Sequence, residues 1–529
     1  MQQRPANQRR QEKQGLPLFT TPISSLIQLD RSSSTPLYQQ ICRTLREAIL
    51  SGELAEGTRL PTERALAQEL HVNRTTVMNA YNELASEGLI EGHVGRGTLV
   101  RRSYRRELDE PFESEYPTWL LGLAEGEHAL LGPDARVLGE IASMGERKEI
   151  ISFASGTPAP DLLPAEIVRD IVDEALVDAR QQALGYCPVE GLHSLRREIA
   201  ARMRRRGVAV DVQHILILSG STQGIGLISR FLLNPGDEVV VEIPTYLGAI
   251  HTFRALGAKV IGVPVDNEGM RVDLLESILA RRQPRFIYTS PTFHNPTGTV
   301  LSQERRRRLL TLTRRYQIPI VEDDAYGEVY FEGHEVQPLK AMDRHEQVLY
   351  LSTYSKILAP GLRVAWLVAP AAMIERLSLH KQVFDLNTNA LGQWIVSEAL
   401  RRHLLDDHLA TIRQRYQQKR NRMLAAIEQY WPSETRVNYP QGGFHLWCRL
   451  PGDMRARMLL REATNERVAF VIGEPFHIDG GGHQHIRLSY ASPEEATITE
   501  GIHRIGDAMR RIQERRSQRE EPVERLPVL

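Results

Sequence analysis

The sequence has few cysteines, no long apolar run and no net charge. Its 529 residues include three cysteines, Cys42, Cys187 and Cys448, which lie far apart without a CxxC spacing. Neither a disulfide framework nor a metal site is therefore predicted. No apolar stretch approaches the ~18 residues that cross a bilayer, and the Gln- and Arg-rich first thirty residues lack the apolar core of a secretory signal. These absences favour a cytoplasmic protein without a membrane segment.

The balance of charge hides an uneven distribution. Lys and Arg together equal Asp and Glu at 66 each, but residues 1–106 carry 15 basic and 10 acidic side chains, which leaves 51 and 56 for the rest. A slightly basic N-terminal segment permits nucleic-acid binding without requiring it. The length itself predicts at least two domains.

Residues 37–86 show the apolar spacing of three consecutive helices. Thr62 and Asn73 each precede a helical segment, and both residue types cap helix N-termini. The third helix begins with Arg74, Thr75 and Thr76. Two short β-prone pieces follow, joined through glycines next to Arg96, which predicts a hairpin. The spacing is typical of a helix-turn-helix followed by a wing.

From about residue 150 to 515, apolar runs alternate with helical segments. Seven runs are predicted strands: 215–218, 238–241, 260–263, 285–288, 318–322, 348–351 and 364–368. This alternation predicts an α/β domain built on a largely parallel sheet.

Lys356 is the candidate nucleophile of this domain. The chain has only seven lysines, and this one ends the segment STYSK, seven positions before Arg363. A lysine that forms an imine with an aldehyde cofactor needs an anion site beside it, which Arg363 and hydroxyls would supply. The turn SGSTQG, residues 219–224, opens a helix, so Ser221 and Thr222 could hold a phosphate with the backbone N–H groups.

Polar side chains also follow two other predicted strands. Asn295 lies in the segment NPTG, and Asp323 and Tyr326 lie in the segment EDDAY. An Asp there can pair with a protonated pyridine nitrogen, and Tyr and Asn can bond the ring hydroxyl oxygen. Each segment alone favours a simple turn over a cofactor contact. Together, and in this order, they resemble the fold type I aminotransferases that use pyridoxal 5′-phosphate (PLP).

This resemblance covers roughly residues 150–510 and implies a mostly parallel central sheet with a smaller C-terminal α/β subdomain. It implies that Lys356 binds the cofactor aldehyde, Asp323 the pyridine nitrogen, Asn295 and Tyr326 the ring oxygen, and Arg363, Ser221 and Thr222 the phosphate. Tyr246, in EIPTY, matches the ring that stacks on the cofactor, and Arg487, in IRLSY, matches the arginine that binds a substrate α-carboxylate. Tyr186, in LGY, matches a tyrosine that reaches the neighbouring subunit's phosphate, which implies a homodimer.

The N-terminal segments STPLYQQI, GTRLPTER, VNRTTV and GRGT resemble the winged helix-turn-helix of GntR-type bacterial regulators. The resemblance implies DNA contacts in the major groove from Arg64, Asn73, Arg74, Thr75 and Thr76, and a minor-groove contact from Arg96. Met78 departs from the pattern, since many such heads carry Arg there. We interpret the basic run 305–308 as a solvated helix face rather than a DNA contact.

A GntR-type head joined to an aminotransferase-like body is the arrangement of MocR-type regulators. The predicted segments are a disordered arm (1–31), the DNA-binding head (32–101), a linker (102–149), the PLP-binding body (150–515) and a tail (516–529).

Three functions fit this arrangement. The leading hypothesis is a homodimeric PLP-dependent transcription regulator that binds a double-stranded operator and senses PLP or an amino compound. The alternative is an aminotransferase, converting an amino acid to a 2-oxo acid, with an accessory DNA-binding head. The EDDAY segment and Arg487 keep full or residual transaminase activity open. In a third hypothesis the body only dimerises.

Overall fold

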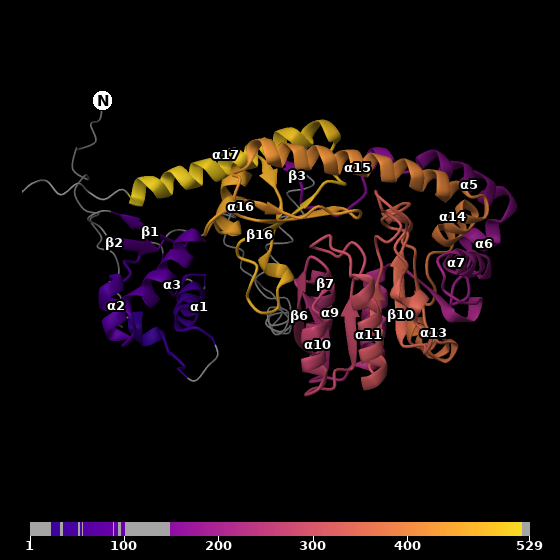
Figure 1. The fold of residues 1–529 in the computed structure, drawn as a ribbon, viewed down its shortest axis with the longest axis horizontal. Coiled ribbons are helices and arrows are strands. Elements are labelled where there is room, and N and C mark those ends of the chain that lie inside the picture. Colours follow the sequence, from indigo (N-terminus) through magenta and orange to yellow (C-terminus); the bar gives the residue numbers. More distant parts are fainter. Residues whose placement is uncertain are drawn as a thin grey trace, which may run out of the picture. The chain divides into compact units, whose positions relative to one another are not determined.

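A computed structural model describes residues 23–31, 35–50, 53–55, 57–87, 89–93, 97–100 and 149–520 (Figure 1). The chain divides into two compact units, Met1–Glu115 and Tyr116–Leu529, which are described separately. Arg96 and nearly all of the predicted linker lie outside the described residues. No helix within the described ranges is long and apolar enough to cross a membrane.

The first unit is a three-helix head with a two-stranded wing. Its elements are α1 (Leu37–Leu50), α2 (Glu63–Glu69), α3 (Arg74–Ser86), β1 (Ile90–His93) and the antiparallel β2 (Gly97–Val100). Both predicted helix caps are confirmed: the Thr62 side chain accepts a hydrogen bond from the Ala65 N–H at 3.2 Å, and Asn73 accepts one from the Thr75 N–H at 3.1 Å. The helices bury a common apolar core that includes Ile41, Leu45, Leu66, Val77 and Leu84.

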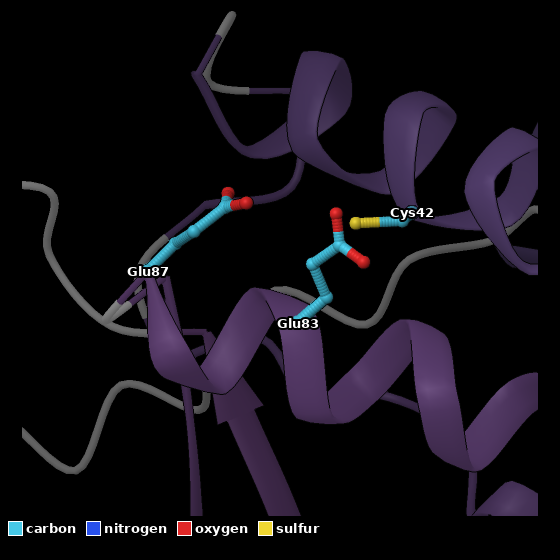
Figure 2. Close-up of side chains that lie close together, drawn as sticks. All are labelled: Cys42, Glu83 and Glu87. Carbon is cyan, nitrogen blue, oxygen red and sulfur yellow. The ribbon is translucent and has the colours of Figure 1, made fainter. Parts of the chain in front are cut away.

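Arg46 joins α1 to the end of α3. Its Nε and Nη2 donate to the Glu87 carboxylate at 2.8 and 2.6 Å, and its Nη2 lies 3.2 Å from Cys42 Sγ and 3.6 Å from Glu83. Figure 2 shows Cys42, Glu83 and Glu87 close together, and their ligand atoms lie within 4.8 Å of one another, a spacing that could hold a metal ion. Because the Arg46 guanidinium already supplies a positive charge to this cluster, we assign it to helix packing.

The predicted boundaries at the two ends of the chain need correction. Ile23–Leu26 form a 3-10 helix, and Ile23 and Ile27 are buried in the core of the head. Arg31 donates from Nη2 to the backbone oxygen of His71 at 2.8 Å. Disorder was the wrong prediction for residues 23–31, because two apolar side chains four residues apart pack against the head. Near the C-terminus, α17 (Glu495–Glu520) continues past the predicted boundary at residue 515.

An eight-stranded sheet with the order β4-β11-β10-β9-β8-β5-β6-β7 forms the centre of the second unit. The strands are β4 (Ile215–Leu218), β5 (Glu238–Ile243), β6 (Lys259–Asp266), β7 (Gly269–Met270), β8 (Phe286–Thr289), β9 (Ile320–Asp323), β10 (Val348–Thr353) and β11 (Ala365–Val368). The pairs from β10 through β9, β8 and β5 to β6 are parallel, whereas β11 runs antiparallel to β10 and β4, and β7 runs antiparallel to β6. All seven predicted strands are present, and the largely parallel sheet is confirmed.

Helices cover both faces of this sheet, which explains why β4, β8, β9, β10 and β11 are buried along their whole length. One face packs against α8 (Ser221–Leu232), α9 (Leu247–Ala255) and α13 (Ala371–Asp385). The other packs against α7 (His193–Arg205), α10 (Val272–Leu279), α11 (Gln303–Tyr316) and α14 (Ala390–Arg401). The remaining helices before the C-terminal part are α5 (Ala165–Asp178), α6 (Arg180–Leu184) and α12 (Leu339–Met342).

A smaller antiparallel sheet with the order β12-β13-β16-β15 forms the expected C-terminal subdomain. Its strands are β12 (Arg436–Val437), β13 (His445–Arg449), β15 (Val471–Ile472) and β16 (His485–Ser489). One face packs its apolar side chains, Leu446 and Leu488 among them, with α15 (Leu404–Tyr430), α16 (Ala456–Asn465) and α17, of which α15 and α17 run side by side (Figure 1). Nearby, β3 (Ile151–Ser152) pairs in parallel with β14 (Val468–Ala469).

Side chains alternate along a strand, so the other face of the small sheet carries His445 and Trp447 of β13. In the register of the sheet, Trp447 lies opposite Arg487 of β16. This face is therefore the one that brings Arg487 to the residues described next.

Candidate functional site

The candidate residues of the body gather at the carboxyl edge of the large sheet. Gly220 and Ser221 follow β4, Tyr246 follows β5, Asn295 follows β8, Asp323 ends β9 and Lys356 follows β10. Because parallel strands end at a common edge, segments far apart in the sequence meet there, as in other open α/β sheets.

Asp323 presents one free carboxylate oxygen inside this site. The Tyr288 hydroxyl donates to Asp323 Oδ2 at 2.6 Å, whereas the buried Oδ1 has no hydrogen-bond partner among the described residues. Burial raises the pKa of Asp323 to about 6, although the Tyr288 hydrogen bond opposes this rise. Above that pH the side chain is an anion with one unsatisfied acceptor, which is the partner that a protonated pyridine nitrogen requires.

The two acidic neighbours of Asp323 have structural partners. Glu322 accepts the backbone N–H groups of Leu339 and Lys340 at 2.7 and 2.9 Å, and burial raises its pKa to about 7. Asp324 accepts hydrogen bonds from Arg206 Nη2 at 2.9 Å and from the Tyr350 hydroxyl at 2.8 Å. Asp324 Oδ1, like Asp323 Oδ1, is buried without a partner among the described residues, but Asp323 is the acidic residue whose charge acts on Lys356.

Lys356 lies in the same site with an amine that is easily deprotonated. Its Nζ donates to the Gly156 backbone oxygen at 2.7 Å. Burial, followed by the positive charges of Arg487 and Arg363, lowers the pKa of Lys356 to about 8, against the opposing charge of Asp323. A pKa near neutrality leaves a useful fraction of free amine, as a nucleophilic lysine needs.

Arg363 and the start of α8 form an anion cradle. Ser221 and Thr222 are the first two residues of this helix, so their backbone N–H groups are free of helical partners and favour an anion. A Cβ on Gly220 would clash with the Arg363 guanidinium, which shows how closely the arginine approaches the turn. Gln223 fixes the turn, since its Oε1 accepts the Ser219 N–H at 2.8 Å and its Nε2 donates to Asp385 at 2.7 Å.

Arg487 is buried where the small sheet meets this edge. Its Nη1 donates to Asn295 Oδ1 at 3.0 Å and its Nη2 to the Ala154 backbone oxygen at 2.8 Å, while its Nε has no partner in the described part of the chain. Burial lowers the pKa of Arg487 to about 10, so the guanidinium remains charged at neutral pH. A cavity of about 280 Å³ opens beside it, lined by Tyr246, Leu247, Gly248, His251, Val471, Phe476 and Arg487.

Tyr326 and Tyr186 occupy contrasting positions. Tyr326 is buried, and its hydroxyl lies 3.3 Å from His445 Nε2. Tyr186 follows α6 and is 87% exposed in the single chain. Other exposed apolar side chains on the body include Val177, Leu184, Leu379, Val383 and Phe384.

In the head, the predicted DNA contacts lie around the start of α3. Arg64, Asn73, Arg74 and Thr75 are exposed and Thr76 is half-buried. The Arg74 guanidinium is held by Glu63 of α2 at 3.1 Å. Arg96 lies outside the described residues. Arg74 and the short polar groups lie at the N-terminus of α3, and Arg64 lies at the start of α2. Exposed arginines and short polar side chains suit contacts with phosphates and base edges.

Several residues around the site were not predicted from the sequence, among them Gly156, Tyr288, His445 and Arg306. Arg306 also corrects the interpretation of the run 305–308 as solvated, because it is fully buried and donates to the Pro291 and Leu301 backbone oxygens at 2.7 and 2.8 Å. It thereby fixes the loop that leads from β8 to Asn295. A buried tyrosine within an apolar strand was the available signal for Tyr288, and a histidine directly after GGF was the signal for His445.

Comparison with known proteins identifies relatives of both units. The family described as aminotransferase class I and II matches residues 148–505, and the family described as bacterial regulatory proteins, gntR family, matches residues 37–100. The chain is 34% identical to the HTH-type transcriptional regulator YisV of Bacillus subtilis (strain 168), over 92% of this chain and 98% of that protein.

Aminotransferases match about three quarters of the chain. The aromatic-amino-acid aminotransferase 1 of Thermococcus litoralis is 38% identical, over 72% of this chain and 93% of its own length. The crystal structure of Pyrococcus horikoshii kynurenine aminotransferase, in complex with PMP, superposes with a TM-score of 0.70 at 36% identity, covering 74% of this chain and 99% of that one.

Proposed function

The chain belongs to the class I and II aminotransferase family and carries a gntR-family regulatory head, and from this premise we propose that it is a transcription regulator of the MocR type. Its cofactor is pyridoxal 5′-phosphate. In this proposal its body responds to an amino compound. The observation that carries this proposal is one buried site that holds both the Lys356 amine and the unpartnered Asp323 oxygen, in a chain whose head exposes the start of α3.

The residues present fit the cofactor. When bound, pyridoxal 5′-phosphate supplies an aldehyde that condenses with primary amines and a pyridine ring that withdraws electrons. Asp323 Oδ1 would hold the proton on the pyridine nitrogen, and Lys356 Nζ would offer its amine. Arg363 and the first N–H groups of α8 would bind the phosphate, Tyr246 would lie against the ring, and Asn295 and Tyr326 would bond its hydroxyl oxygen.

The sensed compound is, in this proposal, an amino acid with an apolar side chain. Arg487 suits a carboxylate, since a guanidinium binds planar anions with two parallel hydrogen bonds. The cavity beside it is lined mainly by apolar groups, including Leu247, Val471 and Phe476. We infer that the carboxylate would replace Asn295 and Ala154 as acceptor for Arg487, while the side chain would fill this cavity.

DNA binding would be bivalent. The exposure of Tyr186 and of neighbouring apolar side chains supports a homodimer in which this tyrosine reaches the partner's phosphate. A dimer would place two heads on paired half-sites of a double-stranded operator. We propose that the protein acts in the cytoplasm, where a bacterial operator lies.

An absorbance and DNA-binding experiment tests this function. The purified protein should acquire a visible absorption band on addition of pyridoxal 5′-phosphate, and amino acids should change its affinity for oligonucleotides selected from a random double-stranded library. Lys356→Ala should abolish the band and the amino-acid response. Lys259→Ala, which removes an exposed lysine of β6, should leave both unchanged. No band in the wild-type protein would contradict the cofactor assignment.

Aminotransfer is the second candidate function. It is favoured by two residues of the site. Arg487 would bind a substrate carboxylate, and Asp323 would keep the pyridine nitrogen protonated, which lets the ring withdraw electrons. Single-turnover absorbance scans with an amino acid, followed by a 2-oxo acid, separate the two. A band that is lost and then restored by the 2-oxo acid identifies an enzyme, whereas a band that only shifts identifies a sensor.

A further inference from the structure

His445 of β13 is a buried histidine inside the candidate site that no step above has used. Its side chain is 2% exposed and lies on the same face of the small sheet as Arg487. Its ring stands edge-on to the Tyr326 ring, with the centroids 5.7 Å apart, and its Nε2 lies 3.3 Å from the Tyr326 hydroxyl. The edge of the imidazole also borders Gly156, where a Cβ would come within 3.0 Å of His445 Cε1.

Burial and the neighbouring positive charges keep His445 neutral. Burial, followed by the positive charges of Arg487 on β16 and Lys356 after β10, holds the pKa of His445 well below its usual value. A neutral imidazole has one N–H donor and one lone-pair acceptor. The Tyr326 hydroxyl is the hydrogen-bond partner of Nε2, and Nδ1 is buried without a partner among the residues described.

Two tautomers are possible, and the surroundings distinguish them. If the proton were on Nδ1, a buried N–H would lack an acceptor, and the Tyr326 hydroxyl would donate its proton to the Nε2 lone pair. If the proton is on Nε2, Nδ1 retains only a lone pair, which is the less costly group to leave unpaired and is favoured by nearby cations. In that tautomer His445 donates to the Tyr326 oxygen, and the Tyr326 proton remains free.

We propose that His445 is a positioning residue whose Nε2–H donates to the Tyr326 oxygen and thereby directs the Tyr326 hydroxyl proton toward the ring oxygen of the bound cofactor. This inference rests on the proposed function, because it assumes that Tyr326 bonds that oxygen. His445 itself need not touch the cofactor. Its effect is to fix the direction in which Tyr326 donates.

The test is the pH midpoint at which the absorption band of the lysine-bound cofactor changes. A hydrogen bond to the ring oxygen stabilises its anion, so losing the bond should raise this midpoint. His445→Leu should raise it by about 0.5 to 1 pH unit, the equivalent of one neutral hydrogen bond. His445→Gln, whose amide can donate from a similar position, should restore most of the wild-type midpoint, whereas His445→Asn should not.

A double-mutant comparison distinguishes positioning from a structural role. In a Tyr326→Phe background, His445→Leu should cause no further rise, because the hydroxyl it directs is gone. Leu446→Val, on the opposite face of the same strand, is the control and should lower thermal stability without moving the midpoint.

Two results would overturn the proposal. An unchanged midpoint in His445→Leu with a normal cofactor band contradicts it, and so does an equal rise in the presence and absence of the Tyr326 hydroxyl. Should the Leu variant not fold, an equal midpoint in the Gln and Asn variants contradicts it as well. Absence of the band from the wild-type protein would instead overturn the proposed function and this inference with it.

Discussion

Tyr288 donates a 2.6 Å hydrogen bond to one oxygen of the buried Asp323 carboxylate and leaves the other oxygen without a partner in the described chain. The two residues come from neighbouring strands, β8 and β9, so the sheet itself fixes their geometry. A buried, ionised carboxylate with one unpaired oxygen destabilises the protein when no ligand is bound. It therefore favours a ligand that can donate a hydrogen bond to that oxygen.

Asp323→Asn should therefore stabilise the protein without cofactor while preventing tight cofactor binding. In the folded wild-type protein the pKa of Asp323 is about 6, whereas the ordinary pKa of an aspartate is 3.8. The folded state therefore binds a proton that the unfolded state has lost, and the free energy of unfolding falls as pH rises from about 4 to about 6. At pH 7 the variant should be more stable by about 1 to 3 kcal/mol, and the gain should shrink as pH falls toward 4. Thermal melts across this pH range measure the effect. A variant less stable than wild type at pH 7 would contradict it.

Gly220→Ala should weaken cofactor binding through the anion cradle of Arg363 and the start of α8, to which the proposed function assigns the phosphate. The added methyl group would displace the Arg363 guanidinium from the start of α8, and we expect the Kd for pyridoxal 5′-phosphate to rise about 10- to 100-fold, as for the loss of one charge-assisted contact. Gly226→Ala, in the same helix with no atom within 4 Å of the new Cβ, is the matched control. It should bind the cofactor normally and be more stable by up to about 1 kcal/mol.

Arg487→Met should separate amino acids from simple amines. Loss of the guanidinium should weaken the response to amino acids by about 100-fold, since charge-assisted bonds to a buried group contribute roughly 1.5–3 kcal/mol each. Primary amines without a carboxylate should keep their effect on the cofactor band. Titrations of that band with phenylalanine and phenethylamine give the comparison, and equal losses for both compounds would count against a carboxylate role.

Val383→Asp should disrupt the dimer. Val383 is 83% exposed at the end of α13, and the adjacent Phe384 and the nearby Leu379 are exposed as well, so a charge there would be buried in any interface that covers them. Sedimentation should shift toward the monomer. Cofactor affinity should also fall if the partner's Tyr186 makes the phosphate contact proposed above. Leu274→Asp, which places the same charge on a half-exposed position of α10, should remain dimeric.

Arg74→Ala should weaken DNA binding and lower its salt dependence. Removing one phosphate contact should reduce the slope of log K against log salt by about 1. Arg74 is paired with Glu63 in the free protein, so Glu63→Gln should raise nonspecific affinity by freeing the guanidinium. Arg169→Ala on α5 removes an equally exposed arginine of the body and should change neither quantity. Fluorescence anisotropy at several salt concentrations measures all three variants.

Local signals in the sequence predicted much of this architecture. Thr62 and Asn73 marked helix starts because a cap needs only a few neighbouring residues. The buried strands were predicted because a sheet covered on both faces requires continuous apolar runs. Asp323 and Lys356 also lie where such runs end, but their roles were predicted from the resemblance that their segments carry.

The residues that were missed depend on contacts between distant segments. His445 lies beside Tyr326 only because β13 and β16 pair in one register and face the large sheet. Arg306 belongs to a basic run that is otherwise typical of a solvated helix, and its burial follows from acceptors around β8 that the pattern of α11 does not reveal. The order of residues 23–31 likewise depends on a surface supplied by the head.

The three consecutive acidic residues at the end of β9 have an evolutionary consequence. Glu322 and Asp324 are needed by the fold, through backbone N–H groups and Arg206, whether or not a cofactor is ever bound. Selection for folding alone would preserve both of them. At position 323 the fold requires only an acceptor for the Tyr288 hydroxyl, which Asn could also supply, so ligand binding is what would preserve the charge of Asp323. Drift at this one position, between two fixed acidic neighbours, would therefore mark the lineages that had abandoned the cofactor.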